Sequence, residues 1–291
     1  MTVRALNNAL KSILARAGIE NPDGDALCIL EAVIGVDRIG LVVRGDEAVG
    51  DRQSEKAIQL ARRRASGEPI QYVVGSWSFM GRDYLVGEGV LIPRDDTEVV
   101  VGAALALLKP VPSPAVVDLC AGSGIIGVTL KKERPDASVA AVEKSGAAFG
   151  YLRKNAEANQ AELRLICADL RNCADEFTDS SLDMIVSNPP YIPSDEIGGL
   201  QSEVQYEPRL ALDGGKDGCD FYEMIVRIWS KKLKPGGYFA FEIGEEQYDR
   251  VKDLLTEHGF TDVREYPDIQ GTIRAVTAAS EGLQYHRVSG H

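Results

Sequence analysis

A short motif near the middle of the chain has side chains that can hold a planar NH₂ group. The motif is Asn188-Pro189-Pro190-Tyr191, and it follows the apolar run 183–187 (DMIVS). The nitrogen of an amide or aromatic amine is a poor nucleophile because its lone pair is delocalised, so it needs alignment more than a strong base. The Asn188 side-chain oxygen and the Pro189 carbonyl can each accept one N–H of such a group. The motif therefore indicates group transfer to a planar nitrogen.

The remaining residues of the motif support the same geometry. Two prolines fix the direction of the carbonyl with little entropy to lose on binding, and Tyr191 offers a flat surface to a planar group. A rigid loop without a ligand is the alternative, which the flanking Asn and Tyr disfavour. We expect Asn188, Pro189 and Tyr191 to be catalytic and all four residues, Pro190 included, to bind substrate. The motif fits adenine as well as glutamine.

A glycine-rich turn upstream is typical of a nucleotide-like cofactor site. The predicted strand 115–120 (AVVDLC) contains Asp118 and is followed by Gly122-Ser123-Gly124 and a helix. Free N–H groups at such a turn can face a ligand. Glu143 ends the next predicted strand about 20 residues later, where an acidic residue can accept both hydroxyls of a ribose.

This spacing permits either a dinucleotide or S-adenosylmethionine. A carboxylate at Asp118 would repel a pyrophosphate, whereas it suits the cationic amino-acid part of S-adenosylmethionine, which we therefore favour. An ordinary turn with a solvated aspartate remains the alternative. At the next strand end, Asp169 can accept from an adenine amino group while Leu170 packs on the ring. Asp169 can equally cap a helix.

These residues need a sheet that brings strand ends to one edge. From about residue 96, strands and helices alternate, which predicts an α/β fold with a mostly parallel sheet covered by helices on both faces. The predicted strands are 115–120, 138–143, 164–169, 183–188, 237–244, 262–268 and 272–278. The predicted helices include 97–108, 146–159 and 221–233.

The first 66 residues have a different pattern, because apolar residues recur at helical spacing in 5–18, 25–36 and 54–67. Residues 72–74, 77 and 79, a turn at 80–83 and residues 84–86 predict a β-hairpin. We expect a helical substrate-recognition domain at 1–70, a β-hairpin linker at 71–95, a Rossmann-like domain at 96–280 and a loosely held tail at 281–291.

Composition limits the classes of function. The formal net charge of −12 disfavours broad adhesion to nucleic acid or an anionic membrane. Five scattered cysteines without a C-x-x-C pair fit free thiols in a reducing compartment, and the three histidines are too dispersed for a metal site. Apolar runs are shorter than a membrane span requires. We expect a cytoplasmic protein with no metal, no membrane contact and no direct nucleic-acid partner.

The chain resembles the release-factor glutamine methyltransferases, the PrmC/HemK family, over roughly residues 5 to 278. The segments that carry the resemblance are 62–101 (RRRASGEPIQYVVGSWSFMGRDYLVGEGVLIPRDDTEVVV), 116–127 (VVDLCAGSGIIG), 185–193 (IVSNPPYIP), 206–225 (YEPRLALDGGKDGCDFYEMI) and 233–244 (LKPGGYFAFEIG). The resemblance implies a monomer with a helical amino-terminal domain that grips the protein substrate. It also implies a Rossmann-like domain that methylates the glutamine of the Gly-Gly-Gln loop in peptide-chain release factors, with S-adenosylmethionine as donor.

The resemblance also implies roles for individual residues of this chain, at the positions that match the family's motifs. The implied cofactor contacts are Cys120, Ala121, Gly122, Ser123, Gly124, Glu143, Leu170 and Asn188, beside Asp118 and Asp169 from the reasoning above. The chain departs from the family at Asp95-Asp96, where Pro-Glu is common, and at Leu170, where an aromatic residue is frequent. Arg94 and Glu98 either hold the rim near the substrate or form a structural ion pair.

Three other functions are compatible with the same motifs. A sibling enzyme would methylate a ribosomal-protein glutamine, although the stretch 92–98 (IPRDDTE) favours release factors. A DNA adenine methyltransferase would have to flip its base, and the acidic charge opposes it. A catalytically silent module that only binds S-adenosylmethionine would not need the intact 188–191 motif.

Overall fold

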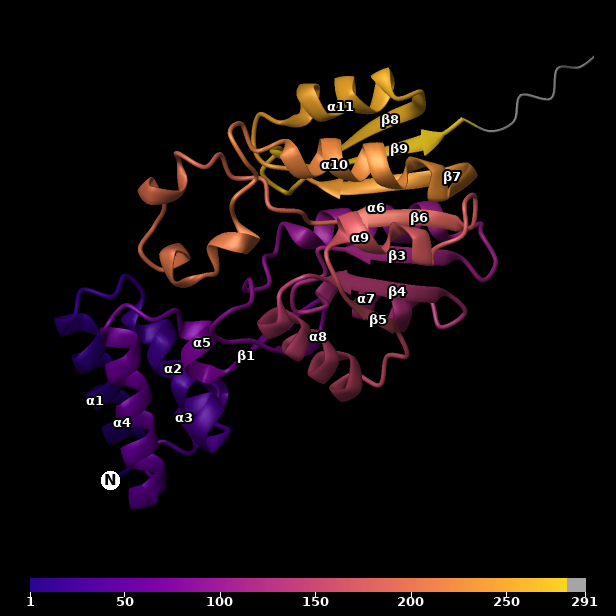
Figure 1. Cartoon of the computed structure of the whole chain (residues 1–291). Coiled ribbons are helices and arrows are strands. Elements are labelled where there is room, and N and C mark those ends of the chain that lie inside the picture. Colours follow the sequence, from indigo (N-terminus) through magenta and orange to yellow (C-terminus); the bar gives the residue numbers. More distant parts are fainter. Residues whose placement is uncertain (282–291) are drawn as a thin grey trace, which may run out of the picture. The chain divides into compact units, whose positions relative to one another are not determined.

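A computed structural model describes residues 1–281, which divide into two compact units (Figure 1). The first unit contains 1–76, 86–88 and 200–206, and the second contains 77–85, 89–199 and the chain from Glu207. The tail predicted at 281–291 lies, after its first residue, outside the described residues. Within the described part, no helix has both the length and the apolar character needed to cross a membrane.

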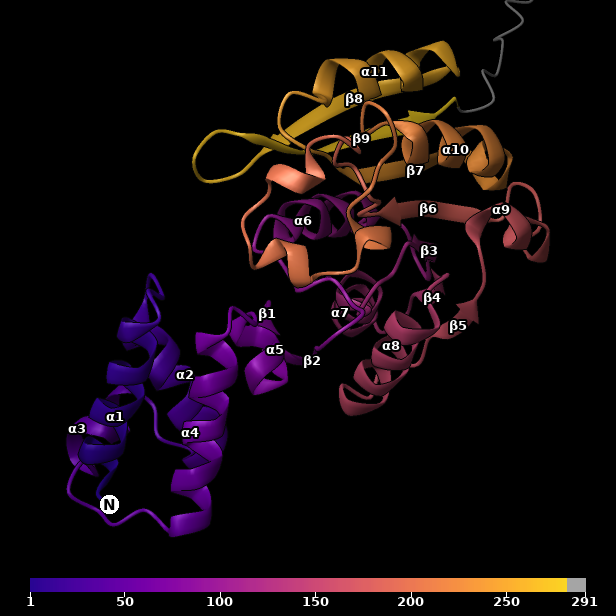
Figure 2. The same cartoon turned by 60° about the vertical axis from the view of Figure 1, so that its left-hand side comes forward.

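The first unit is built from helices whose starts are set by local sequence. Its helices are α1 (Val3–Arg16), α2 (Pro22–Ile34), α3 (Arg38–Val43), α4 (Asp51–Ala65) and α5 (Ile70–Val74). The Thr2 hydroxyl caps α1 and the Asn21 amide oxygen caps α2, each accepting a backbone N–H of the first turn. Buried residues such as Leu6, Leu10 and Ile29 fill the core, and α1, α2 and α4 lie side by side (Figure 2).

The prediction of a strand at residues 72–74 was wrong. Pro69 is the N-cap residue of α5, and Gly75 ends the helix after little more than one turn with a positive φ of 84°. The β-branched pair Val73-Val74 mimics a strand pattern in so short a helix. The hairpin covers fewer residues than predicted, with strands β1 (Ser76–Phe79) and β2 (Arg82–Leu85). Residues 77–85, which include most of the hairpin, group with the second unit.

The second unit contains the predicted sheet. Its strands are β3 (Ala115–Leu119), β4 (Ser138–Glu143), β5 (Arg164–Cys167), β6 (Leu182–Ser187), β7 (Leu233–Glu242), β8 (Phe260–Pro267) and β9 (Ile273–Ser280). Within the described residues they pair in the order β5-β4-β3-β6-β7-β9-β8, with β9 antiparallel to β7 and β8. The predicted α/β fold with a mostly parallel sheet is confirmed.

Helices cover both faces because successive strand residues point to opposite sides. On one face, α6 (Thr97–Leu108), α7 (Ile125–Glu133) and α8 (Gly146–Ala158) pack on residues such as Val116, Ala141 and Val186. On the other, α9 (Leu170–Cys173), α10 (Asp220–Trp229) and α11 (Tyr248–Glu257) pack on residues that include Val117 and Phe239. Short 3₁₀ turns lie at 174–176, 197–199, 204–206, 209–211 and 230–232.

The strand order reverses between β3 and β6, since β4 and β5 extend to one side of β3 and β6 to β9 extend to the other. In open parallel sheets, ligands bind beyond the carboxyl ends of the strands at such a switch point. The Ser187 hydroxyl at the end of β6 donates to the Leu119 carbonyl at the end of β3 over 2.6 Å. This bond holds the two motif-bearing strand ends together.

Candidate active site

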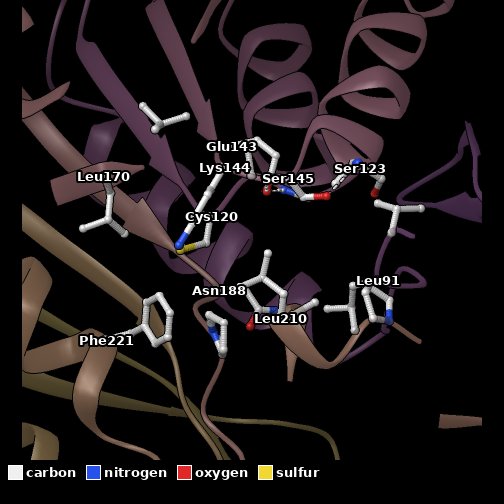
Figure 3. Close-up of a pocket in the computed structure, with 18 of the residues that line it drawn as sticks. Leu91, Cys120, Ser123, Glu143, Lys144, Ser145, Leu170, Asn188, Leu210 and Phe221 are labelled. Carbon is white, nitrogen blue, oxygen red and sulfur yellow. Dashed lines mark hydrogen bonds between the residues drawn. The ribbon is translucent and has the colours of Figure 1, made fainter. Parts of the chain in front are cut away.

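A cavity of about 320 Å³ lies within the second unit at this edge of the sheet. Figure 3 shows Glu143 and Ser145 on one side of it, Leu170 and Phe221 on another, and Leu91 and Leu210 on a third. The predicted residues that line it are Cys120, Ala121, Gly122, Ser123, Glu143, Asp169, Leu170, Asn188 and Pro190. The structure thus brings residues from the ends of four strands, β3 to β6, to one cavity.

The turn between β3 and α7 is shaped by residues with positive φ. Cys120, Gly122 and Gly124 have φ of 59°, 56° and 88°. A Cβ on Gly124 would lie 2.5 Å from Cδ1 of Leu152, so only glycine fits there. Gly124 does not line the cavity; it is the N-cap residue of α7.

Asp118 was expected to contact the cofactor, and the structure places its side chain away from the cavity. Its side chain is fully buried and does not line the cavity. Oδ2 accepts the Gly127 N–H at 2.9 Å, whereas Oδ1 has no hydrogen-bond partner among the described residues. Burial raises the pKa of Asp118 to about 8. The carboxyl therefore fixes the start of α7, and sequence spacing could not reveal which way it points.

Glu143 forms an acceptor site in the cavity wall. Its Oε2 accepts the Gly122 N–H at 2.8 Å and its Oε1 accepts the Ser145 N–H at 2.7 Å. Burial raises its pKa, and these backbone N–H groups oppose the rise. Each carboxylate oxygen keeps a second lone pair. The two backbone hydrogen bonds therefore fix the orientation of the Glu143 carboxylate, and each of its oxygens can still accept one further hydrogen bond.

Asp169 caps α9, as one of the two interpretations of its position predicted. Its carboxylate accepts from the Arg171 backbone N–H at 3.0 Å and guanidinium, and it pairs with Lys144 at 3.0 Å. The Arg171 side chain is the main cause of its lowered pKa. Leu170 follows in the cavity wall, and its carbonyl accepts the Trp229 indole N–H at 3.1 Å. This bond anchors the apolar wall to α10.

The residues of the 188–191 motif face different surroundings. Asn188 and Pro190 line the cavity, whereas Pro189 and Tyr191 do not. The Asn188 Nδ2 donates to the Thr97 hydroxyl at 3.3 Å, which leaves Oδ1 free to accept. The Tyr191 hydroxyl donates to Glu242 at 3.4 Å, and burial raises the pKa of Tyr191.

The backbone of this motif is held by a later segment. Ile192 exchanges hydrogen bonds with Leu212 and Gly214, both 2.9 Å long. The Gln247 side chain donates to the Tyr191 carbonyl at 2.9 Å. A Cβ on Gly214 would lie 2.7 Å from the Tyr191 Cα, so the two backbones are in close contact. The segment 206–220 therefore fixes the motif, which explains its value in recognising the family.

Comparison with known proteins identifies the family. Residues 5–75 match the family model described as PrmC N-terminal domain, and residues 99–199 match the methyltransferase small domain. A release factor glutamine methyltransferase from Geobacter sulfurreducens is 40% identical over 276 residues, covering 94% of this chain and 95% of that protein. Another from Moorella thermoacetica is 38% identical over 96% of this chain and 98% of that protein.

The chain belongs to the release factor glutamine methyltransferase family. The predicted family is confirmed. Solved structures support the fold: the catalytic domain of hMettl16 aligns with a TM-score of 0.57 at 13% identity, covering 92% of this chain and 93% of that chain. A methyltransferase from Pyrococcus furiosus aligns with a TM-score of 0.51 at 17% identity, covering 70% of this chain and 91% of that chain.

The family's Pro-Arg segment forms one rim of the cavity. Arg94 lines the cavity and is paired with Glu207, whose other oxygen accepts the Ile92 N–H at 2.8 Å. An ion pair between Arg94 and Glu98 was one of the two expectations; Glu98 is instead exposed on the first turn of α6. Asp96 belongs to the Asp95-Asp96 pair, at which this chain departs from the family's common Pro-Glu. It forms an ion pair with Arg274 at 3.4 Å.

Several cavity residues were not predicted from the sequence. Leu91, Leu210 and Phe221 supply apolar wall, and Thr97 orients Asn188. They come from loops and helix starts outside the strand-end motifs. Thr97 lies in the stretch 95–98 (DDTE), which is part of a segment that resembles the family. This resemblance could have indicated Thr97 as a site residue.

Proposed function

We propose that this protein transfers a methyl group from S-adenosylmethionine to the side-chain amide nitrogen of the glutamine in the Gly-Gly-Gln motif of release factors. The names of its full-length relatives support the substrate class. One structural observation supports the chemistry most directly: Asn188 lines the cavity that also contains the glycine turn and Glu143, and its Nδ2 is bonded to Thr97, so Oδ1 is the atom available to accept from a substrate.

The cavity residues fit the proposed cofactor. Glu143 has one free lone pair on each oxygen for the two hydroxyls of a ribose, and its orientation is fixed by Gly122 and Ser145. Leu170 and Phe221 provide apolar surface for a purine. The residues proposed to hold the cofactor are Cys120, Ala121, Gly122, Ser123, Glu143, Asp169, Leu170 and Asn188. When bound, S-adenosylmethionine supplies an electrophilic methyl group on a sulfonium sulfur.

The chain's own part in the reaction is alignment. The Asn188 Oδ1 and the Pro189 carbonyl accept the two N–H groups of the glutamine amide, which directs its lone pair away from them. The prolines hold the carbonyl in place, and Tyr191 supports the substrate side chain. Alignment of this kind contributes several kcal/mol, up to about 7–11 in ideal cases. No general base is required before the methyl transfer, because the proton can leave from the cationic amide product.

The proposal extends to the partners and the compartment. Bacterial release factors act on ribosomes, so an enzyme of this family meets its substrate in the cytoplasm. We propose a monomer that recognises a protein rather than nucleic acid. The net charge of −12 supports the last point because phosphate contacts dominate the affinity of nucleic-acid binders.

Methyl-labelled S-adenosylmethionine tests the substrate choice. The protein is incubated separately with a release factor, the same factor carrying Gln→Ala in the Gly-Gly-Gln motif, ribosomal proteins, and duplex DNA. We expect label in the intact release factor only. Label in ribosomal protein alone identifies the sibling activity, and label in DNA contradicts the proposal.

A further inference from the structure

The Gln247 side chain joins the 188–191 motif to the end of β7 and the start of α10. It is half-buried at the N-cap of α11. Its Nε2 donates to the Tyr191 carbonyl at 2.9 Å and to the Gly218 carbonyl at 3.4 Å. Its Oε1 accepts the Gly244 N–H at 2.9 Å. A carbonyl only accepts and a backbone N–H only donates, so these partners fix which end of the amide faces Tyr191.

Glycines surround the same stretch of backbone. A Cβ on Gly218 would lie 2.2 Å from the Tyr191 carbonyl oxygen and 2.5 Å from the Gln247 Nε2. A Cβ on Gly244 would lie 3.1 Å from the Tyr191 Cδ2 and 2.9 Å from the Gln247 Oε1. The interior is close-packed here, so the Tyr191 carbonyl has little room to move while Gln247 holds it.

The 188–191 motif is thus held at both ends. Upstream, Ser187 ends β6 inside the sheet, where it is paired with both neighbouring strands. Downstream, the Tyr191 carbonyl is held by Gln247. Between these points the rings of Pro189 and Pro190 lock two φ angles, so few backbone torsions stay free. The direction of the Pro189 carbonyl therefore follows from the two attachments.

We propose that Gln247 is a positioning residue for methyl transfer: by holding the Tyr191 carbonyl, it directs the Pro189 carbonyl toward the N–H that this carbonyl accepts from the substrate glutamine. This inference rests on the proposed function. Gln247, Tyr191 and Pro189 do not line the cavity, so loss of the Gln247 donor should spare the cofactor contacts. Turnover should suffer instead, because a misplacement of about 1 Å can cost about 100-fold in rate.

The variant Q247E isolates the donor. A carboxylate of the same length can still accept the Gly244 N–H, but it cannot donate to the Tyr191 carbonyl. With a release factor as substrate, we expect kcat to fall about 10- to 100-fold. The calorimetric Kd for S-adenosylmethionine should stay within about threefold of the wild type. The control Q270E adds the same charge at an exposed position of the second unit and should keep the wild-type kcat.

The variant G218A displaces the same carbonyl by contact. It should lower kcat and spare the Kd as Q247E does, and the double variant should be no slower than the slower single variant, because both act on one group. G259A is the control for strain: Gly259 is exposed, has a φ of 81° and has no atom within 4 Å of its Cβ. It should lose stability in urea and keep the wild-type kcat. If G218A does not fold, Q247E decides the inference.

A further measurement does not depend on turnover. The chain contains one Pro-Pro pair, so protein labelled with ¹³C-carbonyl, ¹⁵N-proline gives one carbonyl–nitrogen correlation, from Pro189 to Pro190. This correlation should shift in Q247E and stay at the wild-type position in both controls. An unchanged correlation, or a Q247E enzyme with wild-type kcat, overturns the inference.

Two other outcomes are also decisive. A Kd that weakens as much as kcat falls in Q247E overturns the inference, because that pattern indicates general damage to the structure. A wild type that labels no release factor refutes the proposed function, while the carbonyl–nitrogen correlation still tests whether Gln247 directs the Pro189 carbonyl.

Discussion

Replacing Asp118 by Asn should make the protein's stability less dependent on pH. The Asp118 carboxyl is fully buried, and burial raises its pKa from 3.8 to about 8. Between these two values the folded protein holds a proton that the unfolded chain has released. The contribution of Asp118 to stability is therefore complete below about pH 4 and is lost as the pH rises toward about 8.

The size of the effect follows from linkage. Each pH unit inside this window lowers the free energy of unfolding by up to about 1.4 kcal/mol per group. Between pH 5.5 and pH 7.5, wild type should thus lose up to about 3 kcal/mol relative to D118N. The amide can still accept the Gly127 N–H, so the start of α7 should persist. The Kd for S-adenosylmethionine should change by less than about threefold, because Asp118 does not line the cavity.

Urea unfolding at pH 5.5, 6.5 and 7.5 measures the difference between the two proteins, with calorimetry for the Kd. The exposed Asp83 supplies a matched control, since D83N removes a carboxylate of the same type from the surface of β2. A stability difference between D118N and wild type that stays constant with pH refutes the burial argument. A large loss of cofactor affinity in D118N would restore the original expectation that Asp118 contacts the cofactor.

Two further predictions concern the cofactor wall. Glu143→Gln should weaken binding of S-adenosylmethionine about 10- to 100-fold by calorimetry, because hydrogen bonds to a charged acceptor contribute about 1.5–3 kcal/mol; unchanged affinity contradicts the proposed ribose site. Gly124→Ala should destabilise the protein by about 1–3 kcal/mol in urea, since the new Cβ meets Leu152 at a φ of 88°. The control Gly150→Ala, inside α8 with no atom within 4 Å of its Cβ, should instead stabilise the protein slightly; a Gly124→Ala protein as stable as this control shows the turn to be permissive.

The fold was largely predictable because its signals are periodic. Alternating strands and helices after residue 96 predicted the parallel sheet, and the strand ends with Glu143, Asp169 and Asn188 predicted a shared edge. The strand predicted at 72–74 failed because a helix of little more than one turn, set by Pro69 and Gly75, carries too few residues to show a helical period.

The site was less predictable, because spacing locates a backbone and not the direction of a side chain. Asp118 and Glu143 both lie on strands near the cavity, yet one faces Gly127 inside the protein and the other lines the cavity. Phe221 and Leu210 reach the cavity from segments whose positions depend on tertiary packing. The Arg94–Glu207 pair likewise joins residues far apart in the sequence.

Peptide mapping by mass spectrometry tests the central claim most directly. A release factor incubated with S-adenosylmethionine and the wild-type enzyme should carry one added methyl group, on the glutamine of its Gly-Gly-Gln motif. With Asn188→Ala that methyl group should be absent, or formed at least about 100-fold more slowly, because alignment of the amide is lost. Methylation at any other residue, or an unchanged rate with Asn188→Ala, would contradict the account.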